Sequence, residues 1–134
     1  MLTSQQIDMQ EKLQPLIENY KTRIGESSVL SDGQRLFNYL LKKYLGNERY
    51  EKAAFEKRTG LQKNVYYKLS GSSKEKKDKP VKEETLFDVA VGLRVTYEEA
   101  LMLFTFFGKN LLCDYPYMQK MNEELLQFDL LRNS

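Results

Sequence analysis

The side chains best suited to binding chemistry in this chain lie in residues 59–71, TGLQKNVYYKLSG. Its two glycines are turn signals that predict a short helix between them. At 100° per residue, that helix places Val65, Tyr66 and Leu69 on one face, which we expect to pack inward. The opposite face presents lysine, asparagine and tyrosine, which can hydrogen-bond to base edges or phosphates in a DNA major groove. Together with the residue at the helix start, the predicted DNA-binding residues are Gln62, Lys63, Asn64, Tyr67 and Lys68.

The distribution of charge supports this interpretation, although the net charge of the whole chain is only +2. Residues 1–30 carry a net charge of −1, and residues 81–134 carry −4. Residues 31–80, with thirteen basic and six acidic side chains, carry +7. A basic segment in an otherwise nearly neutral protein is typical of nucleic-acid binding. A solvated, lysine-rich surface is the alternative for both the charge and the polar helix face.

A second group of candidate residues follows in the stretch SGSSKEKKDKP, whose glycine and serine residues predict a loop. Lys74, Lys76 and Lys77 come directly after the expected DNA-binding helix, where they can contact phosphates. The same composition is compatible with a connection whose charge only keeps it solvated. Both interpretations remain open from the sequence.

Enzymatic and metal chemistry are disfavoured by the residue types that are missing. The chain has no histidine and a single cysteine, Cys113, so it lacks nucleophile–histidine pairs and histidine or multi-thiolate metal sites. Its adjacent glutamate pairs fall early in predicted helices, where they favour the positive end of the helix dipole. The sequence has no glycine-rich phosphate loop. We therefore expect a protein without catalytic activity, bound metal or cofactor.

The sequence also bears on where the chain acts. Its longest strongly apolar run, residues 100–107, is far too short to cross a bilayer. The first residues lack the basic start and the apolar centre of a signal peptide. A single cysteine suits a reducing compartment. These features predict a cytoplasmic protein that does not insert into a membrane.

Hydrophobic periodicity predicts an all-α fold of about seven helices, since apolar residues recur at helical spacing and no segment alternates with period two. The predicted start signals are Ser31 or Asp32, Asn47, a capping box of Thr96 with Glu99, and Pro116. Helix ends are predicted at or beside the glycines Gly25, Gly46, Gly60, Gly92 and Gly108. The helices before and after Gly60 form a predicted helix-turn-helix.

The order of residues around this turn resembles the Cro/C1-type (XRE) helix-turn-helix family. The segment FEKRTGLQKNVYYKLSG is followed by KP and then by TLFDVAVGLRVTYEEALMLFTFFGKNL, in an order similar to members of that family. The resemblance covers residues 35–112, and the matching positions are Phe55, Gly60, Leu61, Tyr66, Leu69, Pro80, Thr85, Gly92, Leu93, Glu99 and Gly108. Three features depart from the family pattern: Glu56 replaces a small residue, Gln62 is a weak helix cap, and the loop over residues 70–79 is long.

This resemblance implies a lambda-repressor-like helix-turn-helix bundle with additional N- and C-terminal helices. It implies a sequence-specific regulator of transcription, most simply a repressor, that binds double-stranded DNA. The expected domain boundaries are residues 1–30 for an N-terminal amphipathic helix, 31–113 for the helix-turn-helix domain and 114–134 for a C-terminal helix. The alternative is a protein-interaction or inhibitor module that reuses the same fold.

Apolar stripes in the terminal helices bear on the oligomeric state. Each stripe can cover the core of its own domain, which is the usual role of such a pattern. Repressors with one reading helix usually bind two half-sites as dimers, so the stripes can instead form an interface. We expect a homodimer, with both uses of the stripes open. The stripes are Leu13, Leu16, Ile17, Tyr20 and Ile24 in one helix, and Met118, Met121, Leu125 and Phe128 in the other.

Overall fold

Every regular element in the described part of the chain is helical. The computed structural model describes residues 4–72, 81–111 and 116–133, and these residues contain no strand. The predicted all-α fold is therefore confirmed. The helices are α1 (Ser4–Glu11), α2 (Leu13–Ile24), α3 (Asp32–Leu45), α4 (Glu51–Thr59), α5 (Lys63–Ser70), α6 (Glu83–Leu93), α7 (Tyr97–Phe106) and α8 (Pro116–Asn133).

The N-terminal region forms two helices where the sequence predicts one. Lys12 separates α1 from α2 with φ −92° and ψ 4°, outside the helical range. The described residues therefore hold eight helices, one more than predicted. Among them, no helix combines the length and the apolar composition that a membrane span requires.

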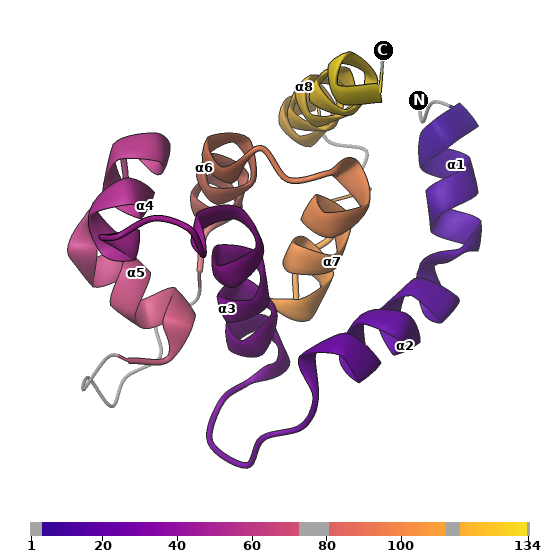
Figure 1. Cartoon of the computed structure of the whole chain (residues 1–134). Coiled ribbons are helices and arrows are strands. Elements are labelled where there is room, and N and C mark those ends of the chain that lie inside the picture. The colour runs from indigo at the N-terminus through magenta and orange to yellow at the C-terminus, as the bar shows by residue number, and fades with distance from the viewer. Residues whose placement is uncertain (1–3, 73–80, 112–115, 134) are drawn as a thin grey trace.

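The helices are arranged around α3, which lies between the α4–α5 pair and α7 (Figure 1). α2 contacts α3 and α7, and α1 and α2 form an arc along the outer side of α7. α6 packs against α4 and α7, and α8 contacts both α6 and α7. α5 therefore lies on the opposite side of the molecule from α1 and α2 (Figure 1).

A cluster of aromatic rings holds α3, α4 and α5 together. Phe37 of α3 and Phe55 of α4 are fully buried, with ring centroids 5.6 Å apart in an edge-to-face arrangement. The ring of Tyr66 in α5 lies 6.2 Å from that of Phe37 and 5.4 Å from that of Phe55. Edge-to-face aromatic pairs at such distances add to the stabilisation that burial alone provides. The predicted inward position of Tyr66 therefore contributes directly to the core.

The capping signals predicted for α3 and α7 are both present. Ser31 Oγ accepts a hydrogen bond from the backbone N–H of Gln34 at 3.2 Å, and the Gln34 side chain accepts from the Ser31 N–H at 3.0 Å. Thr96 and Glu99 form the same reciprocal pair, at 3.1 and 2.9 Å. Each box satisfies two backbone donors that have no partner within the helix.

The predicted start of α4 at Asn47 is wrong, because the helix begins at Glu51. Tyr50 would be an apolar position of the longer helix, but 67% of it is exposed. A helical turn over residues 47–50 would therefore not gain the burial of an apolar face, which is the main source of helix stability in proteins.

The end of α6 lies close to its predicted position but has a different cause. Gly92 belongs to the helix, and Arg94 adopts the left-handed conformation that follows it, with φ 58° and ψ 45°. A Cβ atom on Gly92 would lie 2.7 Å from the Arg58 carbonyl oxygen and 2.8 Å from the Thr59 Cα. This glycine therefore permits the backbone of α6 to approach that of α4 closely.

Both terminal stripes pack on the core of the same chain. Tyr20 is 2% exposed, and the other apolar residues of the α2 stripe are partly buried against the core. The Tyr20 hydroxyl donates a hydrogen bond to Glu98 Oε1 of α7 at 3.0 Å. In α8, Met118, Met121 and Leu125 are buried in the core, whereas the fourth residue of the stripe, Phe128, is partly exposed and lies outside the core cluster. Of the two uses left open for these stripes, the structure shows the covering of the chain's own core.

Candidate nucleic-acid interface

The candidate interface is built on two short helices joined by a three-residue turn. α4 ends at Thr59, and α5 begins at Lys63. Gly60 adopts a left-handed conformation with φ 74° and ψ 5°, and its N–H donates to the Glu56 carbonyl at 2.9 Å. That conformation strains residues with a Cβ, which explains the glycine at this position. The predicted turn is therefore present between the two predicted helices.

The inward face of α5 matches its prediction. Leu69 is fully buried, and Val65 and Tyr66 are half-buried against the core. The Tyr66 hydroxyl donates to Glu51 Oε1 of α4 at 2.9 Å. Burial, together with this hydrogen bond to a carboxylate, raises the pKa of Tyr66 to about 12. The hydroxyl therefore keeps its proton at neutral pH and links α5 to the start of α4.

Two amide side chains from α3 hold the C-terminal end of α5. Gln34 Nε2 donates to the Lys68 carbonyl oxygen at 3.3 Å, and Asn38 Nδ2 donates to the Ser70 carbonyl oxygen at 3.0 Å. The last carbonyls of a helix have no partner within the helix, so these amides supply donors that α5 lacks. Sequence reasoning missed both residues, since they precede their partners by 34 and 32 positions. α5 is therefore held at its inward face and at its C-terminal end.

The predicted outward residues at the start of α5 lie together on the surface. Gln62, Lys63 and Asn64 are consecutive and exposed. Gln62 precedes the first helical residue and makes no side-chain capping hydrogen bond, in line with its classification as a weak cap. Its amide, the Asn64 amide and the Lys63 ammonium group therefore face solvent beside one another at the helix start.

Tyr67 differs from these three residues because it is half-buried and paired. Its hydroxyl oxygen accepts a hydrogen bond from the Lys52 ammonium group of α4. Lys52 Nζ lies 4.5 Å from the centroid of the Tyr67 ring, and the ring of Tyr66 lies 5.8 Å away. The hydrogen bond from Lys52 is the largest cause that lowers the pKa of Tyr67 below its ordinary value. Sequence reasoning did not identify Lys52, which lies 15 positions before Tyr67.

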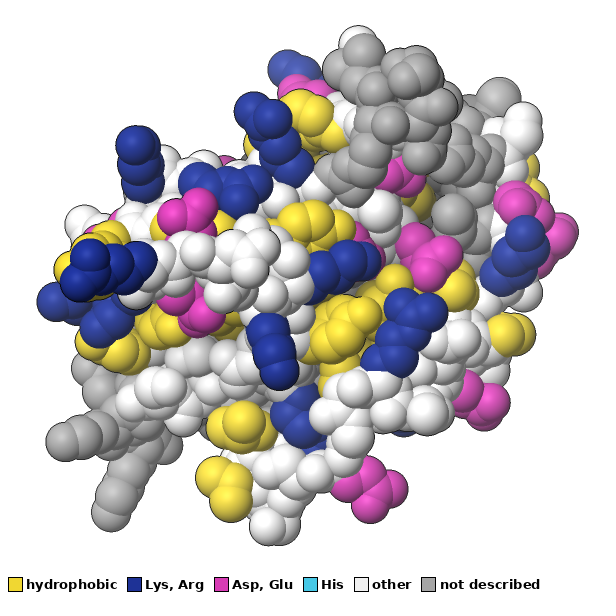
Figure 2. Space-filling view, in the orientation of Figure 1, with side chains coloured by type: hydrophobic (Ala, Val, Ile, Leu, Met, Phe, Trp, Pro, Cys, Tyr) yellow, Lys and Arg dark blue, Asp and Glu magenta, His cyan; other side chains and the backbone are white. Residues whose placement is uncertain are grey.

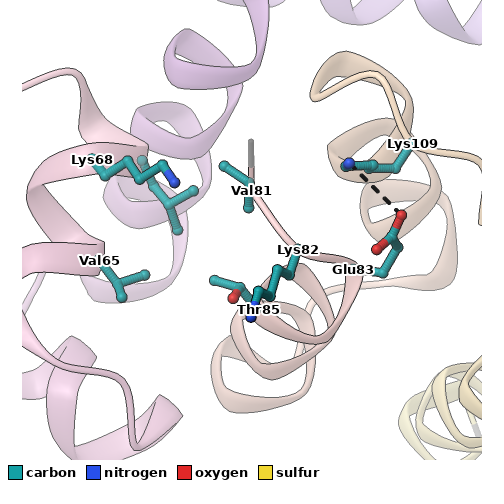
Figure 3. Close-up of a pocket in the computed structure, with 8 residues that line it drawn as sticks. Val65, Lys68, Val81, Lys82, Glu83, Thr85 and Lys109 are labelled. Atoms are coloured by element: carbon teal, nitrogen blue, oxygen red, sulfur yellow. Dashed lines mark ion pairs between the residues drawn. The ribbon is translucent and has the colours of Figure 1, made fainter. Parts of the chain in front are cut away.

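Lys68 is half-buried and lines a groove between α5 and the start of α6 (Figure 3). The groove encloses about 570 Å³, with Val65, Leu69 and Val81 among its apolar lining residues. Lys82 and Lys109 also line it, and Lys109 Nζ lies 3.8 Å from Glu83 Oε1 (Figure 3). Lys68 therefore lies at the edge of the predicted DNA-binding face, toward α6.

The three predicted loop residues, Lys74, Lys76 and Lys77, lie outside the described residues. In the part of the chain that the structure describes, the predicted site residues thus form a group of three at the start of α5, with Tyr67 on the α4 side and Lys68 on the α6 side. In the view of Figure 2, Lys and Arg side chains lie over the side where α4 and α5 are found and continue across the middle of the face. Asp and Glu side chains are more frequent toward the α1–α2 side.

Comparison with known proteins yields no match to a family model, to a curated protein or to a solved structure.

Proposed function

We propose that this chain is a sequence-specific, double-stranded DNA-binding regulator of transcription that acts in the cytoplasm. The observation that carries the proposal is the group of three exposed polar residues, Gln62, Lys63 and Asn64, at the start of a helix that follows a three-residue turn. In DNA-binding helix-turn-helix proteins, the first residues of the second helix meet the base edges. Amide and ammonium groups supply the donors and acceptors that distinguish base pairs in the major groove.

The way in which α5 is held supports this function. A reading helix must keep its side chains in a fixed position, because misplaced groups lose their hydrogen bonds to the bases. α5 contacts α4 through Tyr66 and Glu51, and α3 through Gln34 and Asn38. Its polar start therefore projects from a helix that is tied to the core along its length.

The charge distribution supports electrostatic attraction to DNA. The +7 segment, residues 31–80, includes α3, α4 and α5. Each DNA phosphate neutralised by a lysine or arginine releases a counterion, which makes the affinity steeply dependent on salt. Occupation of an operator by this chain would block other proteins from that site, so repression is the simplest regulatory outcome. The lambda-repressor-like arrangement of α3 to α7 is part of this proposal.

A homodimer is also part of the proposal, because one reading helix contacts few base pairs and two half-sites would double them. The terminal stripes are packed on the chain's own core. The dimer interface would therefore use surface outside these stripes.

A protein-interaction or inhibitor module is the second candidate function. The groove beside Lys68 favours it, since three lysines stand around apolar Val65, Leu69 and Val81. An acidic segment with apolar side chains would complement both parts of such a groove. Replacing Val81 by asparagine, which removes apolar surface without adding charge, should then weaken binding of an acidic protein partner but leave the salt slope of DNA binding unchanged.

The proposed function is tested by fluorescence anisotropy with a random duplex at several salt concentrations. We expect binding at low salt, with an affinity that falls steeply as salt increases. Lys63→Gln should reduce the salt slope by about 0.9, the contribution of one phosphate contact. Lys120→Gln is the matched control, because Lys120 is exposed on α8 and its loss should leave the slope unchanged. Absence of binding at low salt would refute the proposed function and leave the protein-interaction module.

A further inference from the structure

The two adjacent tyrosines of α5 have opposite hydrogen-bonding roles. The Tyr66 hydroxyl donates its only hydrogen to Glu51 Oε1 at 2.9 Å. The Tyr67 hydroxyl oxygen instead accepts a hydrogen from Lys52, whose ammonium group can only donate. Among the residues that the structure describes, none accepts the hydrogen of the Tyr67 hydroxyl. Tyr67 therefore retains a hydrogen-bond donor that the fold does not use, whereas Tyr66 does not.

The charges around the Tyr67 hydroxyl are mainly positive. Lys52 contacts the oxygen directly and lies 4.5 Å from the ring centroid. The positive charge of Lys63, one turn earlier in α5, also acts on the hydroxyl, while Glu56 acts in the opposite direction. Lys63 is exposed, and Lys52 and Tyr67 are half-buried. A donor beside two ammonium groups is suited to a negatively charged acceptor at the protein surface.

The hydrogen bond from Lys52 to the Tyr67 hydroxyl oxygen restricts which groups of DNA this hydroxyl can bind. A hydroxyl that reads base edges by direct contact can serve as donor or acceptor, depending on the base. Lys52 uses part of the acceptor capacity of Tyr67, so the amino groups of adenine and cytosine are poor partners for it. A phosphate oxygen needs only a donor, and its charge is attracted by the two lysines.

We propose that Tyr67 and Lys52, with Lys63 beside them, bind one backbone phosphate of DNA and do not read a base. The Tyr67 hydroxyl donates its hydrogen to an unesterified phosphate oxygen, and Lys52 positions that hydroxyl while adding positive charge. This inference rests on the proposed function, and it assigns Tyr67 to holding the DNA backbone. Base reading is left to Gln62 and Asn64 at the start of the helix.

The first arm of the test detects the Lys52–Tyr67 pair without DNA. The ultraviolet absorbance of tyrosinate is followed against pH for the wild type and for Tyr67→Phe, and their difference isolates the titration of Tyr67. We expect this titration below the ordinary tyrosine pKa of about 10. Lys52→Gln should shift it upward. An unchanged titration in Lys52→Gln would mean that the pair does not form in solution, which would overturn the inference.

The second arm measures binding of two duplexes, one that the wild type has selected from a random pool and one of random sequence. Tyr67→Phe should weaken both by the same factor, about tenfold, as expected for loss of a hydrogen bond to a charged group. Lys52→Gln should weaken both and lower the salt slope by less than the roughly 0.9 of one neutralised phosphate, because Lys63 remains beside that phosphate. Tyr66→Phe is the matched control, because it removes a hydroxyl that donates within the fold. It should lower the melting temperature but leave the affinity of the folded protein unchanged.

The outcomes separate this inference from the proposed function. If the wild type binds DNA and Tyr67→Phe loses affinity only for the selected duplex, Tyr67 reads a base. The inference is then wrong, while the proposed function stands. If Tyr67→Phe binds both duplexes as tightly as the wild type, the hydroxyl contacts neither base nor phosphate. The inference is wrong in this case too, and the proposed function is unaffected. If the wild type binds no duplex, the proposed function fails and the inference fails with it.

Discussion

Replacing Glu99 by glutamine should destabilise the fold by about 2 kcal/mol, because this carboxylate joins α3 to α7. Glu99 is 1% exposed. Its Oε2 accepts from Lys43 Nζ at 2.6 Å, and its Oε1 accepts from the Tyr44 hydroxyl and from the Thr96 N–H at 2.9 Å. The amide of glutamine keeps one acceptor oxygen for Thr96 and Tyr44 but presents a donor to Lys43.

The expected decrease in the free energy of unfolding follows from the loss of the ion pair between Glu99 and Lys43. Removing one partner of a fully buried ion pair costs about 3–5 kcal/mol. The side chain of Lys43 is 46% exposed, so water can solvate its ammonium group in the variant and the cost is reduced. A loss of about 2 kcal/mol corresponds to a decrease in melting temperature of about 8 °C for a domain of this size.

The effect should depend on pH in a defined direction. Burial by itself would raise the pKa of Glu99, but hydrogen bonds from Lys43, Tyr44 and Thr96 outweigh it and hold the pKa below its ordinary value. The charged form therefore stabilises the fold fully above the unfolded pKa of about 4.3, and this stabilisation is lost as the pH falls through the folded pKa. The difference between wild type and variant should be constant from pH 6 to 8 and should shrink in acid.

Thermal and urea unfolding, followed by circular dichroism at several pH values, measure this difference. Glu123→Gln is the matched control, since Glu123 is exposed on α8 and its substitution should change the free energy of unfolding only slightly. Equal stability of Glu99→Gln and the wild type at pH 7 would refute the reasoning. A difference that does not shrink in acid would show that the carboxylate charge is not its source.

Three further predictions concern packing, the loop and the oligomeric state. Gly92→Ala should lower the free energy of unfolding in urea by about 1–3 kcal/mol, because its Cβ would lie 2.7 Å from the Arg58 carbonyl oxygen. If this variant were as stable as the wild type, the close approach of α6 to α4 would be contradicted. Replacing Lys76 and Lys77 together by glutamine should weaken selected and random DNA equally and reduce the salt slope by up to about 2, and an unchanged slope would exclude phosphate contacts there. Light scattering at about 10 µM, a concentration at which modest homodimers form, should give the mass of two chains, and a monomer at that concentration would count against the homodimer.

The sequence predicts this fold best where the responsible residues are neighbours. The box of Thr96 and Glu99 spans three positions, and both of its hydrogen bonds are present. Glycine is less informative, because it serves helix ends and close backbone approaches alike. Gly60 has the positive φ of a turn, whereas Gly92 lies within a helix against Arg58 and Thr59. Only the packing of α6 on α4 distinguishes the two cases.

In the candidate site, too, only those features that depend on neighbouring residues could be predicted from the sequence. The exposed positions of Lys63 and Asn64 follow from helical rotation, which the sequence provides directly. The pairing of Tyr67 with Lys52 depends on how α4 crosses α5, and no periodic pattern in the sequence encodes it. The same holds for the α3 amide of Asn38, which donates to the end of α5. Helix faces are thus predictable here, and contacts between helices are not.

The central claim, that α5 reads DNA sequence, is tested most directly with Asn64→Ala. A preferred duplex is first selected from a random pool with the wild type, and binding isotherms are then measured for wild type and variant on preferred and random DNA. Asn64 is exposed, so its replacement should leave the fold intact. We predict a loss of about 1–3 kcal/mol on the preferred duplex and little change on random DNA. Equal losses on both DNAs, or a pool from which the wild type selects no preferred sequence, would contradict the claim.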